Sequence, residues 1–313
     1  MHVPLEPTPA IRSLVAHAVP GVEEVTVTET DAAGSPLAAT ARRLVAATPA
    51  PHDARDVSTT DAPVLVEVEI ARDRVVVLPE TSSSTGSSTG SAPGVPRGRQ
   101  DRVLDDVVRR WFGLDDDLDA VVAHLRRDPL LAPLVARRPH LRVLGHPDGF
   151  EAAVQTVLGQ QVSLAAARTL TGRVAQAYAS VRVGGLALFP DPPTLAAVDP
   201  AELRDVTRAT NARARTVVAL AQACADGLVL APGVDRGDAR RRLLAVPGIG
   251  PWTADYLALR ALGDRDAFPA GDLVLRRALG VEHERDVAAA APLWSPWRAY
   301  AAQHLWTARL FDA

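Results

Sequence analysis

The sequence of 313 residues predicts an α+β domain followed by an all-α domain, and its length suits roughly two domains. Strand-like segments, in which apolar and polar residues alternate, are confined to the first third of the chain. Beyond them, apolar residues recur almost everywhere at helical spacing. We therefore place an α+β N-terminal domain at residues 1–113 and an all-α domain at residues 114–313.

The N-terminal domain is predicted to be a small antiparallel sheet with helices. Residues 11–19 form a helix-like segment that Pro20 and Gly21 end, and an amphipathic helix at 103–112 should pack on the sheet. Residues 81–99 are rich in Ser, Thr and Gly and cannot bury enough apolar surface to become ordered, so we interpret them as a flexible surface insertion. The strands are expected at 25–28, 37–45, 64–70 and 75–78.

The second domain is predicted to be a series of short helices with almost no strand candidates. One long helical pattern, at 149–179, is interrupted by Gly159, Gln160 and Gln161. The other helices are expected at 118–126, 130–138, 195–199, 202–207, 212–226, 239–246, 252–262, 273–279 and 297–310.

Two of these helices, at 239–246 and 252–262, are joined by a Pro-Gly-Ile-Gly-Pro turn. Gly248 and Gly250 allow the backbone to enter left-handed conformations without a Cβ penalty, and Pro251 suits the first position of a helix. The second helix then begins with unpaired N–H groups that can hold a phosphate oxygen. A plain turn between packed helices is the alternative, because short glycine patterns are common.

The composition excludes several classes of protein. A net charge of −3 restricts any nucleic-acid contact to a local surface, and a single cysteine, Cys224, excludes an internal disulfide framework and cysteine-rich zinc sites. The chain contains no lysine, so a Schiff base and a phosphate-binding loop with its lysine are excluded. No apolar run approaches the roughly 20 residues that cross a membrane, and no signal-peptide pattern is present, so we expect a cytoplasmic protein without membrane contact.

Four segments carry a resemblance to a known family: 149–163 (GFEAAVQTVLGQQVS), 188–203 (LFPDPPTLAAVDPAEL), 246–273 (VPGIGPWTADYLALRALGDRDAFPAGDL) and 293–306 (LWSPWRAYAAQHLW). Together they resemble the helix–hairpin–helix family of DNA base-excision glycosylases, and within it the bacterial DNA-3-methyladenine glycosylase II family. The resemblance implies a hydrolase of base excision repair that flips alkylated bases, of the 3-methyladenine and 7-methylguanine type, out of double-stranded DNA and cleaves their N-glycosidic bonds. It also implies a bacterial, nucleoid-associated protein that requires no cofactor.

Asp272 is the candidate catalytic residue. Cleavage of an N-glycosidic bond develops positive charge on the deoxyribose, and a nearby carboxylate can stabilise that charge or activate water. Asp272 lies at the end of the third motif segment, one residue before Leu273, and stands at the head of the helix expected at 273–279. An aspartate at this position is also a favoured N-cap, and the two roles are compatible.

The candidate base pocket consists of Trp252, Tyr256 and Trp294. Trp252 and Tyr256 stand four residues apart on one helix face, where their rings could attract a positively charged base by stacking and cation–π interaction. By resemblance, Trp294 forms a further wall. Core packing is the alternative for all three. Relatives that also cut the DNA strand resemble this hairpin but carry a lysine where this chain has Trp252, so we expect a monofunctional enzyme without lysine-dependent lyase activity.

The candidate DNA contacts lie on two turns. Backbone N–H groups at Gly248 and Gly250 are expected to bind phosphates, which carry no sequence information. By resemblance, Gln160 and Gln161 lie where a side chain wedges into the duplex, although Gln161 replaces a bulky aliphatic residue. Arg276 is either an electrostatic helper or an ordinary surface charge.

The resemblance further implies a structural monovalent cation, Na⁺ or K⁺, held by backbone carbonyls of residues 246–250. We expect a monomer, because a bent duplex needs one accessible face. Two alternatives stay open: a glycosylase for other lesions, such as deaminated or oxidised bases, and a non-catalytic helix–hairpin–helix protein that binds DNA.

Overall fold

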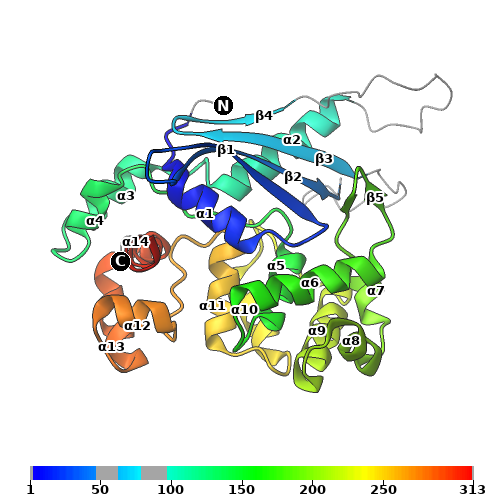
Figure 1. The fold of residues 1–313 in the computed structure, drawn as a ribbon. Helices are drawn as coiled ribbons and strands as arrows, with labels where there is room; N and C mark the ends of the chain where they lie inside the picture. Colours follow the sequence, from blue (N-terminus) through cyan, green and yellow to red (C-terminus); the bar gives the residue numbers. More distant parts are fainter. Residues whose placement is uncertain (1–2, 47–62, 79–96, 312–313) are drawn as a thin grey trace, which may run out of the picture.

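The computed structural model describes residues 3–46, 63–78 and 97–311. Figure 1 shows the main sheet across the top with most of the helices below it. The sheet is an antiparallel meander in the order β1-β2-β3-β4. The predicted antiparallel sheet is therefore confirmed. Its strands are β1 (Glu23–Thr30), β2 (Pro36–Val45), β3 (Val64–Ala71) and β4 (Arg74–Val77).

One face of the sheet packs on two helices, α1 (Pro7–His17) and α2 (Arg97–Phe112). In β3, buried residues alternate with half-buried ones, as expected for a strand with one covered face. The helices and the sheet share one hydrophobic cluster, to which α1 contributes Ile11 and α2 contributes Trp111. This packing confirms the expected helix against the sheet, although α2 begins at Arg97, earlier than predicted.

Residues 81–96 of the predicted serine-rich insertion lie outside the described residues. Residues 97–99, the last three of the predicted insertion, belong to α2. The boundary predicted between residues 113 and 114 stays a prediction. Among the described residues, no helix has the length and apolar character needed to span a bilayer.

The rest of the chain is helical, which confirms the predicted fold class. A two-stranded hairpin, β5 (Arg182–Val183) and β6 (Leu186–Ala187), and the helix α13 were not predicted. The helices are α3 (Leu118–Leu125), α4 (Ala132–Arg137), α5 (Gly149–Leu158), α6 (Leu164–Tyr178), α7 (Pro192–Ala196), α8 (Pro200–Thr207), α9 (Asn211–Ala225), α10 (Arg236–Ala245), α11 (Pro251–Arg260), α12 (Leu273–Leu279), α13 (Glu284–Ala290) and α14 (Arg298–Phe311), with a 3-10 turn at Ala291–Trp294.

Side-chain caps explain where many of these helices begin. In each case a side-chain oxygen of the residue before the helix accepts a hydrogen bond from a backbone N–H of the first turn, which satisfies a group that has no partner inside the helix. The capping residues are Asp117, Asp148, Ser163, Asp191, Asp199, Thr210, Asp235 and Asp272.

A buried ionic cluster joins the sheet to the helical part. Arg43 of β2 donates to Glu23 of β1 at 2.9 Å and to Glu151 of α5 at 2.5 Å, and the Arg43 and Glu151 side chains are each 1% exposed. Burial raises the pKa of Glu151 to about 7 against the opposing attraction of Arg43, and the nearby carboxyl groups of Asp148 and Glu23 add to the rise. The sheet is thus fixed to α5, which forms one wall of the cavity described below.

Candidate active site

The two hairpin helices are α10 and α11, and the turn between them has the predicted position. Gly248 adopts a φ of +91°, so this glycine uses the left-handed region. The same expectation is wrong for Gly250, whose φ of −98° and ψ of 177° are extended backbone open to any residue. Thr216 of α9 supports the turn from behind, because its hydroxyl lies 2.9 Å from the carbonyl oxygen of Pro247.

Replacement of the two glycines by alanine should therefore change the free energy of unfolding by different amounts. Gly248→Ala should lower the free energy of unfolding by about 2 to 3 kcal/mol, because it adds left-handed strain and a methyl group that collides with the Thr216 side chain. For Gly250→Ala the change should stay within about 0.5 kcal/mol, since no described heavy atom lies within 4 Å of the added Cβ. Urea denaturation of both variants measures this difference. An equal loss at both positions would contradict the assigned backbone geometry.

The turn between α5 and α6 lies against the hairpin. Gln160 donates its amide N–H to the Gly248 carbonyl at 3.1 Å, and Arg213 of α9 donates to the Gln160 carbonyl. Gln161 is exposed and has a φ of +56°, in the left-handed region. The structure thus brings the Gln160–Gln161 turn and the glycine hairpin together on one surface, while the wedge role stays a prediction.

Asp272 is the N-cap of α12 and is 9% exposed. Its Oδ1 accepts hydrogen bonds from the backbone N–H groups of Val274 and Leu275 at 2.9 Å each, and from the indole N–H of Trp306 at 3.1 Å. Its Oδ2 accepts one hydrogen bond, from the indole N–H of Trp252 at 3.0 Å. A carboxylate has about four acceptor positions, so Oδ2 keeps capacity for a further donor such as water.

Three aromatic rings stand beside this carboxylate. Trp252 stacks on Tyr256 with ring centroids 5.2 Å apart, and Tyr256 meets Trp306 edge-on at 6.3 Å. The sequence did not single out Trp306, although it ends the last of the four motif segments. The structure does not bring Trp294 into this group: it is 1% exposed and donates its indole N–H to Asp128 at 2.8 Å. The expectation that Trp294 forms a pocket wall is therefore corrected to a core role.

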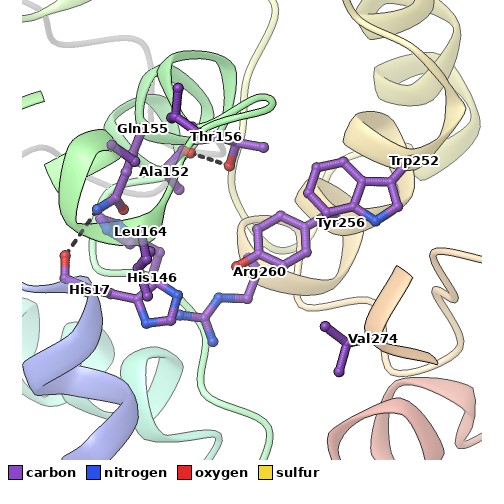
Figure 2. Close-up of a pocket in the computed structure, with 13 residues that line it drawn as sticks. His17, His146, Ala152, Gln155, Thr156, Leu164, Trp252, Tyr256, Arg260 and Val274 are labelled. Atoms are coloured by element: carbon purple, nitrogen blue, oxygen red, sulfur yellow. Dashed lines mark hydrogen bonds between the residues drawn. The ribbon is translucent and has the colours of Figure 1, made fainter. Parts of the chain in front are cut away.

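A cavity of about 380 Å³ opens between α1, α5, α6, α11 and α12. Figure 2 shows Trp252 and Val274 at one end, His17, His146 and Arg260 at the other, and Tyr256 between them. This volume falls within the range of small-molecule pockets and is ample for a nucleobase. The remaining wall is formed by Ala152, Gln155, Thr156, Gly159, Val162, Leu164 and Ala167.

The two histidines at the far end of the cavity are neutral. Burial lowers the pKa of His17 to about 4 and lowers the pKa of His146 well below its ordinary value, with Arg260 adding to both shifts. His17 Nδ1 lies 2.7 Å from the Ser13 carbonyl, which only accepts, so Nδ1 carries the proton and Nε2 is an acceptor. Sequence patterns gave no signal for these residues.

Two further expectations find no support in the geometry. Arg276 donates to the carbonyl of Glu282 beyond the end of α12, a contact that suits a structural role, and its part in DNA binding stays a prediction. The carbonyls of Val246, Pro247 and Gly248 each accept one hydrogen bond, and each oxygen keeps a second lone pair. The monovalent ion likewise stays a prediction.

The chain matches two family descriptions. Residues 154–283 match the HhH-GPD superfamily of base excision DNA repair proteins, and residues 99–148 match the AlkA N-terminal domain. The first match contains the hairpin, the aromatic pair and Asp272.

The chain is also similar to solved structures. It shares a TM-score of 0.74 and 18% identity with the 3-methyladenine DNA-glycosylase of Archaeoglobus fulgidus, over 100% of this chain and 99% of that one. With the 8-oxoguanine glycosylase/lyase of Clostridium acetobutylicum, in complex with DNA, the TM-score is 0.62 and the identity 18%, over 80% of this chain and 83% of that one. At this identity the likeness concerns the fold alone.

Sequence relatives are more similar. The chain is 46% identical over 208 residues to a Mycobacterium tuberculosis protein named as a probable bifunctional transcriptional activator/DNA repair enzyme, AlkA, covering 64% of this chain but only 41% of the relative. It is 39% identical to the DNA-3-methyladenine glycosylase 2 of Escherichia coli over 56% of this chain and 63% of the relative. The chain therefore spans less than two thirds of the length of each of these two relatives. It is 31% identical to the DNA-3-methyladenine glycosylase of Bacillus subtilis over 64% of this chain and 70% of that protein. The chain therefore belongs to the DNA-3-methyladenine glycosylase family, within the helix–hairpin–helix superfamily of base excision DNA repair proteins.

Proposed function

We propose that this protein is a monofunctional DNA glycosylase that flips alkylated bases, of the 3-methyladenine and 7-methylguanine type, out of double-stranded DNA and removes them by hydrolysis. One observation carries the proposal: the carboxylate of Asp272 is held by the indole of Trp252, which also lines a cavity large enough for a base. We further propose that it acts as a monomer on the nucleoid DNA of the cytoplasm.

The geometry suggests how the reaction proceeds. The bond between C1′ and the base nitrogen breaks with its electron pair on the base, which leaves positive charge on the deoxyribose. Asp272 stabilises this charge, and its less occupied oxygen, Oδ2, can accept the proton of the attacking water. An alkylated purine that carries positive charge leaves as a neutral molecule, and the stacked rings of Trp252 and Tyr256 offer it an electron-rich wall.

The absence of lysine supports hydrolysis without strand cleavage. An amine nucleophile is needed to form a Schiff base with the sugar, and the sequence contains no lysine side chain at all. The resemblance implies that Trp252 occupies the hairpin position at which relatives that also cut the DNA strand carry that lysine. The product should be an intact strand with an abasic site.

A lesion panel tests the proposed function. Duplexes that each contain one 3-methyladenine, 7-methylguanine, uracil or hypoxanthine are incubated with the protein, and free base and strand breaks are measured in the same sample. Release of the alkylated bases, with breaks only after alkali treatment, is expected. A covalent amine adduct trapped by borohydride would contradict the hydrolytic mechanism, and binding without any base release would favour a non-catalytic DNA-binding protein.

Trp252→Phe should lower the single-turnover rate of base release by about 10-fold for cationic and neutral lesions alike. The substitution keeps an aromatic ring against Tyr256 but removes the N–H that holds Asp272 Oδ2, and a small misplacement of a catalytic group is costly. Trp297→Phe is the matched control, because Trp297 packs edge-on against Tyr300 away from the cavity. A loss confined to cationic lesions would show that Trp252 acts through its ring face alone.

A further inference from the structure

Arg260 occupies the inner end of the cavity. It follows Trp252 and Tyr256 at four-residue spacing, so the three side chains lie along one face of α11 with a rise of about 6 Å at each step. Figure 2 shows its guanidinium close to the rings of His17 and His146, on the opposite side of Tyr256 from Trp252. A base stacked near Tyr256, with its sugar toward Asp272, would therefore direct its far edge at Arg260.

The charge of Arg260 is not paired within the cavity, although its attraction opposes the burial that raises the pKa of Glu23. Its Nη1 donates to the Leu144 carbonyl at 2.6 Å, and in the part of the chain that the structure describes no carboxylate forms an ion pair with it. The carboxyl groups of Glu23 and Glu151 bond to Arg43 instead. A half-buried cation of this kind is costly unless an acceptor meets it, and its remaining N–H groups face a cavity that can supply one.

The neighbouring histidines cannot supply a negative charge. His17 and His146 are both neutral, because burial and Arg260 lower the pKa of each ring. The inner end of the cavity thus presents a fixed cation with donor groups beside neutral acceptors such as His17 Nε2. This chemistry suits a base that carries a carbonyl oxygen at its far edge, and it is unfavourable there for a base that is itself positively charged.

We propose that Arg260 is a second catalytic residue, which donates a hydrogen bond to the 6-carbonyl oxygen of a neutral damaged purine, such as hypoxanthine, and stabilises the negative charge that this base acquires as it leaves. The inference rests on the proposed glycosylase function and assigns to Arg260 the stabilisation of neutral leaving bases in the same cavity. Cationic bases depend on the stacked rings at the outer end, whereas neutral carbonyl bases depend on the guanidinium at the inner end.

The two classes differ in the charge of the leaving group. When the C1′–N bond of a cationic base breaks, the electron pair neutralises the base. When the same bond of a neutral base breaks, the pair makes the base an anion, whose charge spreads onto its carbonyl oxygen and is stabilised by Arg260. Water adds its oxygen to C1′, and the proton that it loses passes through Asp272 and solvent to the departing base, so the products are a neutral purine and an abasic site.

The test compares two substrates in the same variants. Single-turnover release of hypoxanthine and of 3-methyladenine, which is cationic and has no 6-carbonyl oxygen, is measured for the wild type, for Arg260→Gln and for Arg260→Lys. Removal of a donor aimed at a developing negative oxygen lowers rates by about 100-fold, so Arg260→Gln should lower hypoxanthine release by about that factor and 3-methyladenine release by less than about 10-fold. Arg260→Lys, which keeps the charge, should lie between wild type and Arg260→Gln for hypoxanthine.

The control variant is Arg127→Gln, which removes an exposed arginine beyond the end of α3 and should leave the ratio of the two rates as in the wild type. Equal losses for both substrates in Arg260→Gln would overturn the inference, since a disturbed fold or DNA surface would act on both. Wild-type release of 3-methyladenine without any release of hypoxanthine would overturn it as well. Failure of the proposed function is distinguishable, because the wild type would then release neither base.

Discussion

Asp272→Asn is expected to lower the single-turnover rate of 7-methylguanine release by about 10³-fold, because the variant lacks the negative charge that opposes the positive sugar. Binding to DNA that contains an abasic site should change little. The amide oxygen can take the place of Oδ1 and keep its three N–H partners, so the cap of α12 survives. The amide NH₂ then meets the indole N–H of Trp252, a donor against a donor.

Asp128→Asn is a closely matched control for this variant. Asp128 also accepts two backbone N–H groups, from Leu130 and Leu131, and an indole N–H, from Trp294, but it lies away from the cavity. Base release by Asp128→Asn should stay within a few-fold of the wild type (about 3-fold, within the scatter expected for a residue remote from the chemistry). Equal losses in both variants would show that Asp272 acts through the fold and not on the sugar.

Arg43→Ala should lower the free energy of unfolding by about 3 to 5 kcal/mol, because it leaves two buried carboxyl groups, Glu23 and Glu151, without their cation. Without that cation the folded-state pKa of each glutamate stays above its unfolded value. Folding then binds protons, so the stability of the variant should fall further as the pH rises from about 5 to about 8. Urea denaturation at several pH values measures both effects.

The neighbouring Arg42→Ala provides the comparison. Arg42 pairs with Glu24 of β1 and Glu67 of β3, but these side chains are partly exposed to solvent, and such pairs contribute less than about 1 kcal/mol. Similar losses in the two variants would mean that Arg43 is no more important for the junction between sheet and helices than a surface arginine.

Local patterns were sufficient to predict the sheet, the hairpin and the position of Asp272. The alternation of apolar residues in β3 fixes which of its faces is buried, and Gly248 lies where a left-handed turn is needed. Asp272 was expected to combine an N-cap with a catalytic role, and the cap is confirmed. These features depend on residues that are close together in the sequence, and therefore leave a local signal.

The parts that the sequence could not predict depend on contacts between distant segments. Trp294 and Trp306 lie in one motif segment, yet Trp294 turns toward Asp128, 166 positions earlier, while Trp306 turns toward Asp272. Nothing in the sequence distinguishes their orientations. The place of Arg260 and His17 in the cavity could not be predicted either, since each resembles an ordinary surface residue in the sequence. They come together only because α1 and α11 meet at the cavity.

A crystal structure of Asp272→Asn bound to a duplex with one 7-methylguanine would test the central claim most directly. The expected result is a base extruded into the cavity against Tyr256, with its deoxyribose in contact with the side chain at position 272 and the hairpin N–H groups on the DNA backbone. A base that stays stacked in the duplex, or a sugar separated from position 272 by other protein groups, would contradict the assigned site.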